Sequence, residues 1–306
     1  MTQTFTLAHF SDVHLSPLIG FTPRTWNAKR GLGFFNWQRK RRFVHQRSVV
    51  DSLIADALSL NVDHIAITGD LINLGLPSEY DGALAWLRSI ASPESVTIVP
   101  GNHDIYSKIG SDIGVMRWAP YMGAEPETLA FPFVRRIGPI ALVGLNSAVP
   151  TRPFFASGRL GAEQIEVAGE LLERLKVDGG IRVVLIHHPP VPGLTPSRRA
   201  LTDAHHFKRV LERAGAELVL YGHNHTPRVD WLAAEGGAIP LVCAGSASAA
   251  VAHGAEPLGC YGVYTFFKSD AGVRIRRTLR GFSNAGGPVV KLSEEMLEGS
   301  NENFVI

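Results

Sequence analysis

Carboxylate, imidazole and amide side chains recur in this sequence in short clusters that directly follow apolar runs. The clusters are "SDVH" at 11–14, "TGDL" at 68–71, "GNHD" at 101–104, "HHPP" at 187–190 and "GHNH" at 222–225. A single Asp or His in such a place is typically a turn or capping residue. Five clusters in one chain, all offering oxygen or nitrogen and none offering sulfur, instead indicate a metal site.

The apolar runs before these clusters have the β-branched composition of buried strands. We expect strands near 5–10, 64–68, 95–99, 140–146, 182–187, 218–221, 239–244, 262–267 and 273–278. Apolar residues at helical spacing predict helices near 50–57, 76–87, 165–175 and 207–214. Alternating strands and helices favour largely parallel sheets, and ligands bind such sheets outside the carboxyl ends of the strands.

The ligand types indicate which metals would bind. Carboxylate, imidazole and amide groups suit Mn²⁺, Fe or Zn²⁺, and the lack of thiolates argues against Fe–S clusters and structural zinc. The clusters hold more strong ligands than one ion needs if water must also bind, which favours two ions with a bridging carboxylate. Two ions about 3.5–4 Å apart form a clamp for in-line phosphoester hydrolysis, acidify a shared water to hydroxide and neutralise phosphoryl oxygens.

The motif order D-x-H, GD, GNHD, HH and GHxH, which runs from residue 12 to residue 225, resembles that of the calcineurin-like metallophosphoesterases. Within that superfamily, "GNHD" and "GHNH" in a compact chain are most similar to the class III cyclic-nucleotide phosphodiesterases. The resemblance implies an α/β fold, a four-layer α/β/β/α sandwich with two mixed sheets flanked by helices. We expect a single domain over 1–306, in which C-terminal strands at about 239–278 complete the second sheet.

The resemblance also implies two groups of metal ligands that share one carboxylate. The groups are Asp12, His14 and His225 for the first ion, and Asn102, His187 and His223 for the second, with Asp70 as the bridge. His187 is preferred to its neighbour because it directly ends a strand, whereas no family role carries over to His188.

His103 is the predicted catalytic residue and not a ligand. By the same resemblance, its imidazole would contact the scissile phosphate, and would stabilise the transition state or protonate the leaving oxygen. Asp104 would either orient a neighbouring group or cap a following helix.

Two long segments, 15–42 and 189–203, fit no secondary structure well, and such loops are often functional. The first contains a basic and aromatic stretch, 21–42, that would form a lid over a nucleotide or rest against anionic lipid headgroups. A solvated loop entering a helix is the alternative. In the second segment, Arg198 and Arg199 are candidates for substrate binding, together with Asn102, although solvated loop charges would look the same.

The metal centre specifies a reaction but not a substrate. The favoured interpretation is a dinuclear, metal-dependent phosphodiesterase that acts on a cyclic nucleotide or a similar small diester. The main alternative is a membrane-surface hydrolase for a phospholipid headgroup or a lipid-linked pyrophosphate. A non-catalytic scaffold would be expected to have lost ligands, whereas the matched set here is complete. A nuclease has no nucleic-acid-binding motif in its favour.

The composition is that of a globular protein with a sizeable core: 306 residues, 45% hydrophobic, with a net charge of +2. The near-neutral charge demands no polyanionic partner. Two cysteines exclude a disulfide framework. The first residues lack the pattern of a signal peptide, and no run has the length of a membrane span, so we expect a cytoplasmic protein. The sequence leaves open whether the chain forms a homo-oligomer.

Overall fold

The computed structural model describes residues 3–18, 20–107, 114–269 and 272–298, and these residues form two six-stranded mixed sheets. In spatial order, the first sheet contains β12 (Val289–Met296), β11 (Gly272–Phe282), β10 (Cys260–Ser269), β1 (Gln3–Phe10), β2 (His64–Ile67) and β3 (Val96–Ile98). The second contains β4 (Phe133–Ile137), β5 (Ile140–Gly144), β6 (Ile181–Leu185), β7 (Leu218–Tyr221), β9 (Gly237–Cys243) and β8 (Arg228–Ala234).

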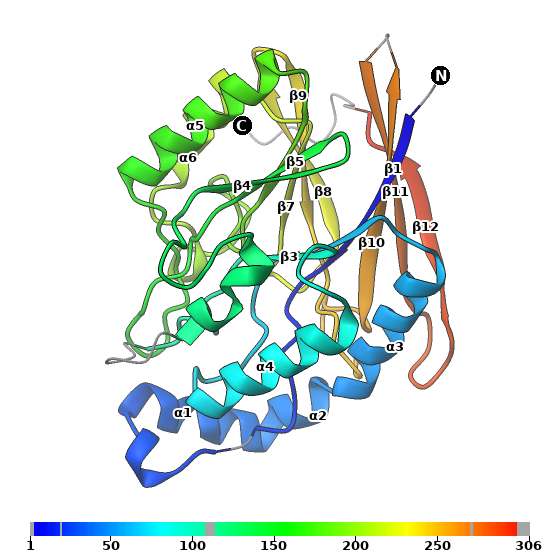
Figure 1. Cartoon of the computed structure of the whole chain (residues 1–306). Coiled ribbons are helices and arrows are strands. Elements are labelled where there is room, and N and C mark those ends of the chain that lie inside the picture. Colours follow the sequence, from blue (N-terminus) through cyan, green and yellow to red (C-terminus); the bar gives the residue numbers. More distant parts are fainter. Residues whose placement is uncertain (1–2, 19, 108–113, 270–271, 299–306) are drawn as a thin grey trace.

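Helices cover the outer face of each sheet. The helices α3 (Arg47–Ser59) and α4 (Pro77–Ile90) pack on the first sheet, and α5 (Ala162–Val177) and α6 (Ala204–Ala214) pack on the second (Figure 1). Three apolar clusters separate the four layers, one on each helical side and one between the sheets. In β1, Leu7 faces the other sheet while Ala8 and Phe10 face the helices, because successive strand residues point to opposite sides. The expected four-layer sandwich is confirmed.

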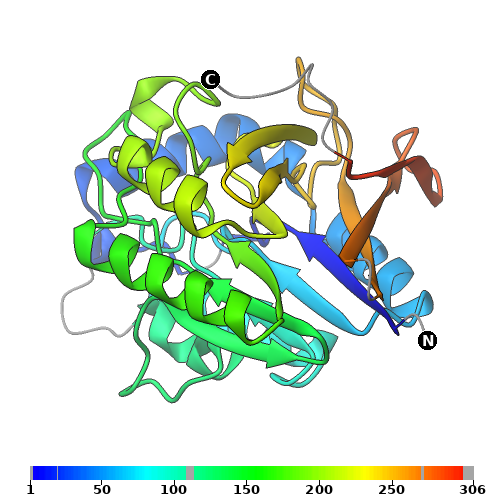
Figure 2. The same ribbon diagram turned by 90° about the horizontal axis from the view of Figure 1, so that it is seen from above.

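Both sheets are parallel at the centre and antiparallel toward the edges. The strands β1, β2 and β3 run parallel, as do β5, β6, β7 and β9, whereas β10, β4 and β8 each run antiparallel to a neighbour. Seen from above, the strands of both sheets lie at the centre of the molecule (Figure 2), and the residues just after β1 and β7, Asp12 and His223, are joined by a hydrogen bond. The carboxyl ends of the parallel strands therefore open toward the same end of the molecule.

The expected placement of the C-terminal strands was wrong in part. Of the strands over 239–278, β9 joins the second sheet, but β10 and β11 extend the first, because β10 pairs antiparallel with β1. The tip of the expected hairpin, residues 270–271, lies outside the described residues. Three strands were not predicted at all: β4, β8 and β12.

The segment 15–42, for which no element was predicted, contains short helices at the end of the molecule where the parallel strands open (Figure 1). After a short 3-10 turn at Pro23–Thr25, helix α1 (Ala28–Asn36) begins at Asn27, whose side chain accepts a hydrogen bond from the backbone of Arg30. It continues through a π-helical turn at Trp37–Arg41 into α2 (Arg42–Val44). Among the described residues, no helix has both the length and the apolar character needed to cross a membrane.

Candidate metal centre and active site

All seven predicted metal ligands lie together where the carboxyl ends of the two sheets meet. Of the seven non-glycine residues with positive φ among those described, five are predicted ligands: Asp12, His14, Asp70, His223 and His225. This left-handed conformation is unfavourable for residues with a Cβ, and it concentrates at functional sites. The tight turns after the strands therefore aim these donors at a common point.

Two glycines let the loops approach closely. A Cβ at Gly101 would lie 2.3 Å from Oδ1 of Asp70. A Cβ at Gly222 would lie 1.9 Å from the hydroxyl of Ser11 and 2.6 Å from Oδ2 of Asp12, although Gly222 follows a strand of the second sheet and Asp12 a strand of the first. Only glycine fits at either point.

The first predicted ligand group surrounds the carboxylate of Asp12. Its Oδ1 lies 3.1 Å from Nε2 of His225 and 4.0 Å from Nε2 of His14. The Nε2 atom of His14 is also 3.9 Å from Oδ2 of Asp70. Since Nδ1 of His14 lies 3.3 Å from the carbonyl of Ile72, we assign the proton to Nδ1, which leaves the Nε2 lone pair facing the carboxylates.

The second predicted group surrounds His187. Its Nδ1 lies 2.7 Å from the carbonyl of Thr68, which fixes the ring. Its Nε2 then faces three other predicted ligands: Oδ1 of Asn102 at 3.1 Å, Nδ1 of His223 at 3.2 Å and Oδ2 of Asp70 at 3.5 Å. Asp70 thus lies between the two groups, as a bridging ligand would.

The neighbouring His188 takes no part in this arrangement. Its Nδ1 lies 2.7 Å from the hydroxyl of Ser147, and its Nε2 lies 3.2 Å from the carbonyl of Ala156. Both ring nitrogens are therefore engaged away from the other donors.

The donor set fits metal ions. Nε2 of His14, which faces the carboxylates of Asp12 and Asp70, is buried and has no hydrogen-bond partner among the described residues, although leaving a buried polar atom unpaired is costly. Carboxylate, imidazole and amide donors suit borderline and hard divalent ions. Three sets of donors lie within 4.8 Å of one another: Asp12, His14 and His225; His14, Asp70 and His103; and Asp12, Asp70 and His187. These overlapping sets fit a dinuclear site.

The electrostatics favour bound cations. Burial and the adjacent charge of Asp12 raise the pKa of Asp70 to about 8. Burial alone would lower the pKa of His225, but Asp12 and Glu256 together raise it to about 9. A cation beside these groups would reverse both shifts, because it stabilises the carboxylate and the neutral imidazole.

Asp104 holds the Asp70 loop in place. Its buried carboxylate accepts hydrogen bonds from the backbone N–H groups of Asp70 at 2.8 Å, Leu71 at 2.9 Å, Ile72 at 3.2 Å and Gly101 at 2.8 Å. Of the two roles expected for Asp104, it therefore orients a neighbouring group.

His103 differs from the predicted metal ligands because both of its ring nitrogens contact residues outside the predicted ligand set. Nδ1 donates to the carbonyl of Asn73 at 2.6 Å, and Nε2 accepts from Nη1 of Arg41 at 3.1 Å. Its backbone N–H donates to Oδ1 of Asp70 at 2.7 Å. His103 thus lies against the predicted bridge, with its ring held beside a guanidinium.

Arg41 is a site residue that sequence reasoning did not single out. Its Nε and Nη2 atoms are buried and have no hydrogen-bond partner among the described residues, and the side chain lines the same cavity as Asp70 and His103. The sequence marked it only as one of four consecutive cations. Which of them faces the site depends on the π-helical turn at Trp37–Arg41, a feature that is frequent at functional sites.

Further unpredicted residues support the ligands from outside. Oε2 of Glu256 lies 3.1 Å from Nδ1 of His225, so it orients that imidazole. Lys40 and His253 line the same cavity and contact each other, with Nζ of Lys40 at 2.8 Å from Nε2 of His253. The His45 ring contacts the edge of the His14 ring, with centroids 4.5 Å apart.

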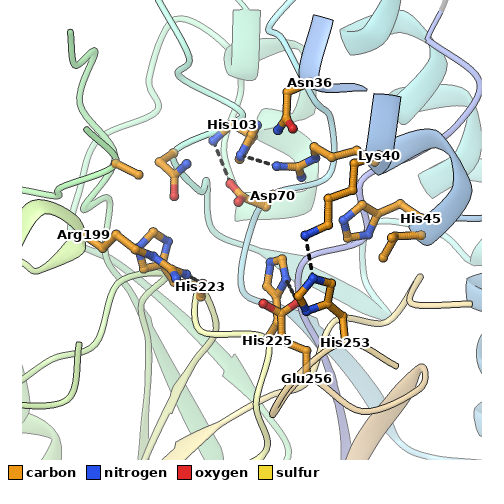
Figure 3. Close-up of a pocket in the computed structure, with 14 residues that line it drawn as sticks. Asn36, Lys40, His45, Asp70, His103, Arg199, His223, His225, His253 and Glu256 are labelled. Atoms are coloured by element: carbon orange, nitrogen blue, oxygen red, sulfur yellow. Dashed lines mark hydrogen bonds and ion pairs between the residues drawn. The ribbon is translucent and has the colours of Figure 1, made fainter. Parts of the chain in front are cut away.

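The metal chamber, as we name this cavity, has a volume of about 330 Å³. Figure 3 shows Arg199 and His223 on one side, Lys40 and His45 on the other, and Asp70 between them. Of the predicted substrate-binding residues, Asn102 and Arg199 line this chamber, and Arg199 also donates to the carbonyl of His223. Arg198 lines an adjoining cavity instead.

Comparison with known families identifies the class. A family model described as calcineurin-like phosphoesterase matches residues 5–227. The chain therefore belongs to the calcineurin-like phosphoesterase family, as the order of its motifs predicted.

Among named relatives, the chain is 30% identical over 166 residues to a probable cyclic nucleotide phosphodiesterase of Synechococcus, a match that covers 53% of the chain and 58% of that relative. It is 26% identical over 227 residues to a glycerophosphodiester phosphodiesterase of Enterobacter lignolyticus, covering 72% of the chain and 70% of the relative. A dimetal phosphatase from Danio rerio shares the fold, with a TM-score of 0.59, 14% identity and coverage of 94% of this chain and 98% of that one.

Proposed function

We propose that this chain is a dinuclear metal-dependent phosphodiesterase. The observation that carries the proposal is the convergence of seven oxygen and nitrogen donors from five strand ends, with Asp70 between the other six. The first ion would be held by Asp12, His14 and His225, the second by Asn102, His187 and His223, and both by Asp70. When bound, such a pair of ions activates a shared water for in-line attack on phosphorus and neutralises phosphoryl oxygens.

Arg41 would bind the substrate phosphate. Its two unpartnered N–H-bearing nitrogens offer the planar fork that matches phosphoryl oxygens. A phosphate that accepts from Arg41 would draw Nη1 away from Nε2 of His103. That ring nitrogen would then face the leaving oxygen, while the bond from Nδ1 to Asn73 keeps the ring aligned.

The substrate within this class would be a phosphodiester, and the first candidate is a cyclic nucleotide or a similar small diester. Two relatives are named as probable cyclic nucleotide phosphodiesterases, and a third as a glycerophosphodiester phosphodiesterase, which supports a diester. We extend the proposal to manganese or iron as the metals, with zinc as an alternative, to a cytoplasmic location and to a single domain. Asn102 and Arg199 would contact the substrate at the metal chamber.

A second candidate is a lipid phosphoester. The cavity beside the metal chamber is lined by apolar side chains, including Leu32, Phe35 and Phe154, and this observation favours a substrate with a hydrocarbon arm.

Metal analysis combined with a hydrolysis panel tests the proposed function. With Mn²⁺ present, we expect two ions per chain and turnover of bis(p-nitrophenyl) phosphate, with cyclic nucleotides, phosphomonoesters and phospholipids compared alongside. His103→Ala should keep both ions yet lose turnover by roughly 10²–10⁴-fold, as expected for an acid–base group. One ion per chain at saturation, no diester turnover, or stoichiometric metal loss in His103→Ala would each contradict the assignment.

A further inference from the structure

A larger cavity, which we name the side chamber, opens beside the metal chamber and has a volume of about 600 Å³. The two chambers share wall residues Asn36, Asn102, His103, Ala156 and Arg199. The rest of the side chamber is formed mainly by α1 and by residues 153–155, with hydrocarbon from Leu32, Phe35, Pro153 and Phe154. A substrate whose phosphorus lies in the metal chamber can therefore extend an apolar arm into the side chamber.

Positive charge and the absence of carboxylates mark the surroundings of the side chamber. Three stretches of the sequence that contribute to it, 13–50, 128–162 and 179–202, contain no Asp or Glu. The described residues that line it include cations, among them Lys29 and Arg198, but no carboxylate. Such a surface attracts an anionic partner.

Three aromatic residues of the side chamber each carry a cation over the ring. The distances to the ring centroids are 4.4 Å for Lys29 over Tyr106, 5.2 Å for Arg39 over Phe35 and 4.6 Å for Arg152 over Phe155. Apolar rings alternating with cations are typical of surfaces that bind at the membrane interface, where rings enter the headgroup layer and cations meet phosphates.

The rim of the side chamber presents large apolar side chains to solvent. Phe154 is 85% exposed and Phe35 is 59% exposed. Phe154 also has a φ of 69°, so an unfavourable backbone conformation projects an apolar ring into water. Its loop is held by the Thr151 hydroxyl, which donates to the carbonyl of Phe155 at 2.6 Å and accepts from Nζ of Lys29 at 2.8 Å. That second bond ties the loop to α1 across the chamber.

We propose that this rim docks on an anionic membrane and that the side chamber receives a hydrocarbon chain of a lipid phosphodiester whose phosphate reaches the metal chamber. The inference rests on the proposed function, which supplies the chemistry. A water oxygen bonds to phosphorus, the P–O bond to one ester arm breaks, and the leaving oxygen takes the proton, which yields a phosphomonoester and an alcohol. A nucleoside base is the competing occupant. A base would stack on ring faces inside the cavity, whereas the ring of Phe154 is mostly in solvent.

A pair of matched substrates tests the side chamber. Glycerophosphoglycerol and short-chain phosphatidylglycerol, used as a monomer, contain the same diester and differ only in their acyl chains. For the Mn²⁺-loaded protein we expect kcat/KM for the acylated diester to exceed that for the deacylated one by at least about tenfold, a modest yield from burying hydrocarbon. Equal rates, or a preference for the deacylated diester, would overturn the inference and leave the proposed function intact. No turnover of either diester or of bis(p-nitrophenyl) phosphate would instead refute the proposed function.

A matched pair of variants tests the rim. Phe35→Ser/Phe154→Ser removes exposed apolar rings at the side chamber, and Leu60→Ser/Val177→Ser removes exposed apolar side chains elsewhere. In sedimentation with phosphatidylcholine vesicles that contain phosphatidylglycerol, the rim variant should lose at least about tenfold in binding, and the control variant should bind as the unmodified chain does. The rim variant should also lose its preference for the acylated substrate.

The vesicle arm needs no catalysis, so it reports on the surface even if the proposed function fails. The inference would be overturned if the unmodified chain does not bind the vesicles, or if the rim variant and the control variant bind them equally. If the rim variant instead loses kcat/KM on 3′,5′-cyclic AMP and not on the acylated diester, the side chamber holds a base and the lipid proposal is wrong.

Discussion

The two chambers share Asn102 and His103 but are built by opposite means. Donors of the metal chamber follow strands whose positions are fixed by the sheets, and most of them are buried. Five of the seven have positive φ, and Asp104 holds the loop of Asp70. The side chamber is formed by α1 and residues 153–155, with rings exposed to solvent. This difference indicates that the strand ends of the two sheets position the metal-binding side chains, while the connecting segments position the substrate. Changes in the first should affect all substrates, and changes in the second only some.

The largest effect is expected for Asp70→Asn. Loss of the predicted bridging charge should remove one or both ions and reduce kcat on every diester by about 10³-fold or more. Metal analysis and bis(p-nitrophenyl) phosphate turnover provide the measurement. Glu170→Gln, on the exposed face of α5, is the control and should change neither. A variant with full metal content would show that Asp70 does not bridge.

A smaller effect is expected for Arg41→Ala, at about 10²-fold in kcat on all diesters with both ions retained, because a preorganised donor to the phosphate is lost. Arg41→Lys should recover part of the rate, since an ammonium keeps the charge but not the fork. Steady-state kinetics and metal analysis of both variants and of the unmodified chain provide the measurement.

The neighbouring exposed Arg42→Ala is the control for the Arg41 variants. Equal rates for Arg41→Ala and Arg42→Ala would place the Arg41 side chain outside the reacting groups.

The smallest effect is expected for Arg39→Gln/Arg42→Gln, which alters the exposed charge near the rim. Vesicle affinity should fall by about 1 kcal/mol per residue, and bis(p-nitrophenyl) phosphate turnover should stay within about twofold. Sedimentation at low and high salt is the measurement, because salt screens this attraction.

The control for the rim charges, Arg174→Gln/Arg209→Gln, removes the same net charge from α5 and α6. If the rim-charge variant and this control lose the same amount of vesicle affinity, then the net charge of the protein governs binding and the position of the charges near the rim does not.

Much of the fold was predictable because its central strands are buried on both faces. The missed strands β4, β8 and β12 are all edges of their sheets. An edge strand pairs on one side only and carries charges, as "FVRRI" of β4 does, so its apolar signature is weak. The placement of β10 and β11 in the first sheet was not predicted, because which strands pair is a long-range property that the local sequence pattern does not encode.

The predicted ligands could be found from sequence because each motif directly follows a strand whose end is fixed. Arg41 could not, since its orientation depends on a π-helical turn that alters the helical period. Phe154 could not either. Its exposure follows from a left-handed backbone at a non-glycine residue, which apolar patterning does not predict.

The close approach at Gly222 has a consequence for how the molecule tolerates change. Loops from the two sheets touch there with no room for a side chain, and the backbone N–H of His223 donates to Oδ2 of Asp12 at 3.0 Å. The spacing between the two ligand groups is therefore set by how tightly the sheets pack, and not by rotamers. Substitutions in the core between the sheets, far from any donor, therefore alter the spacing of the metal-binding side chains. Sequence change in that core is thus constrained by catalysis as well as by stability.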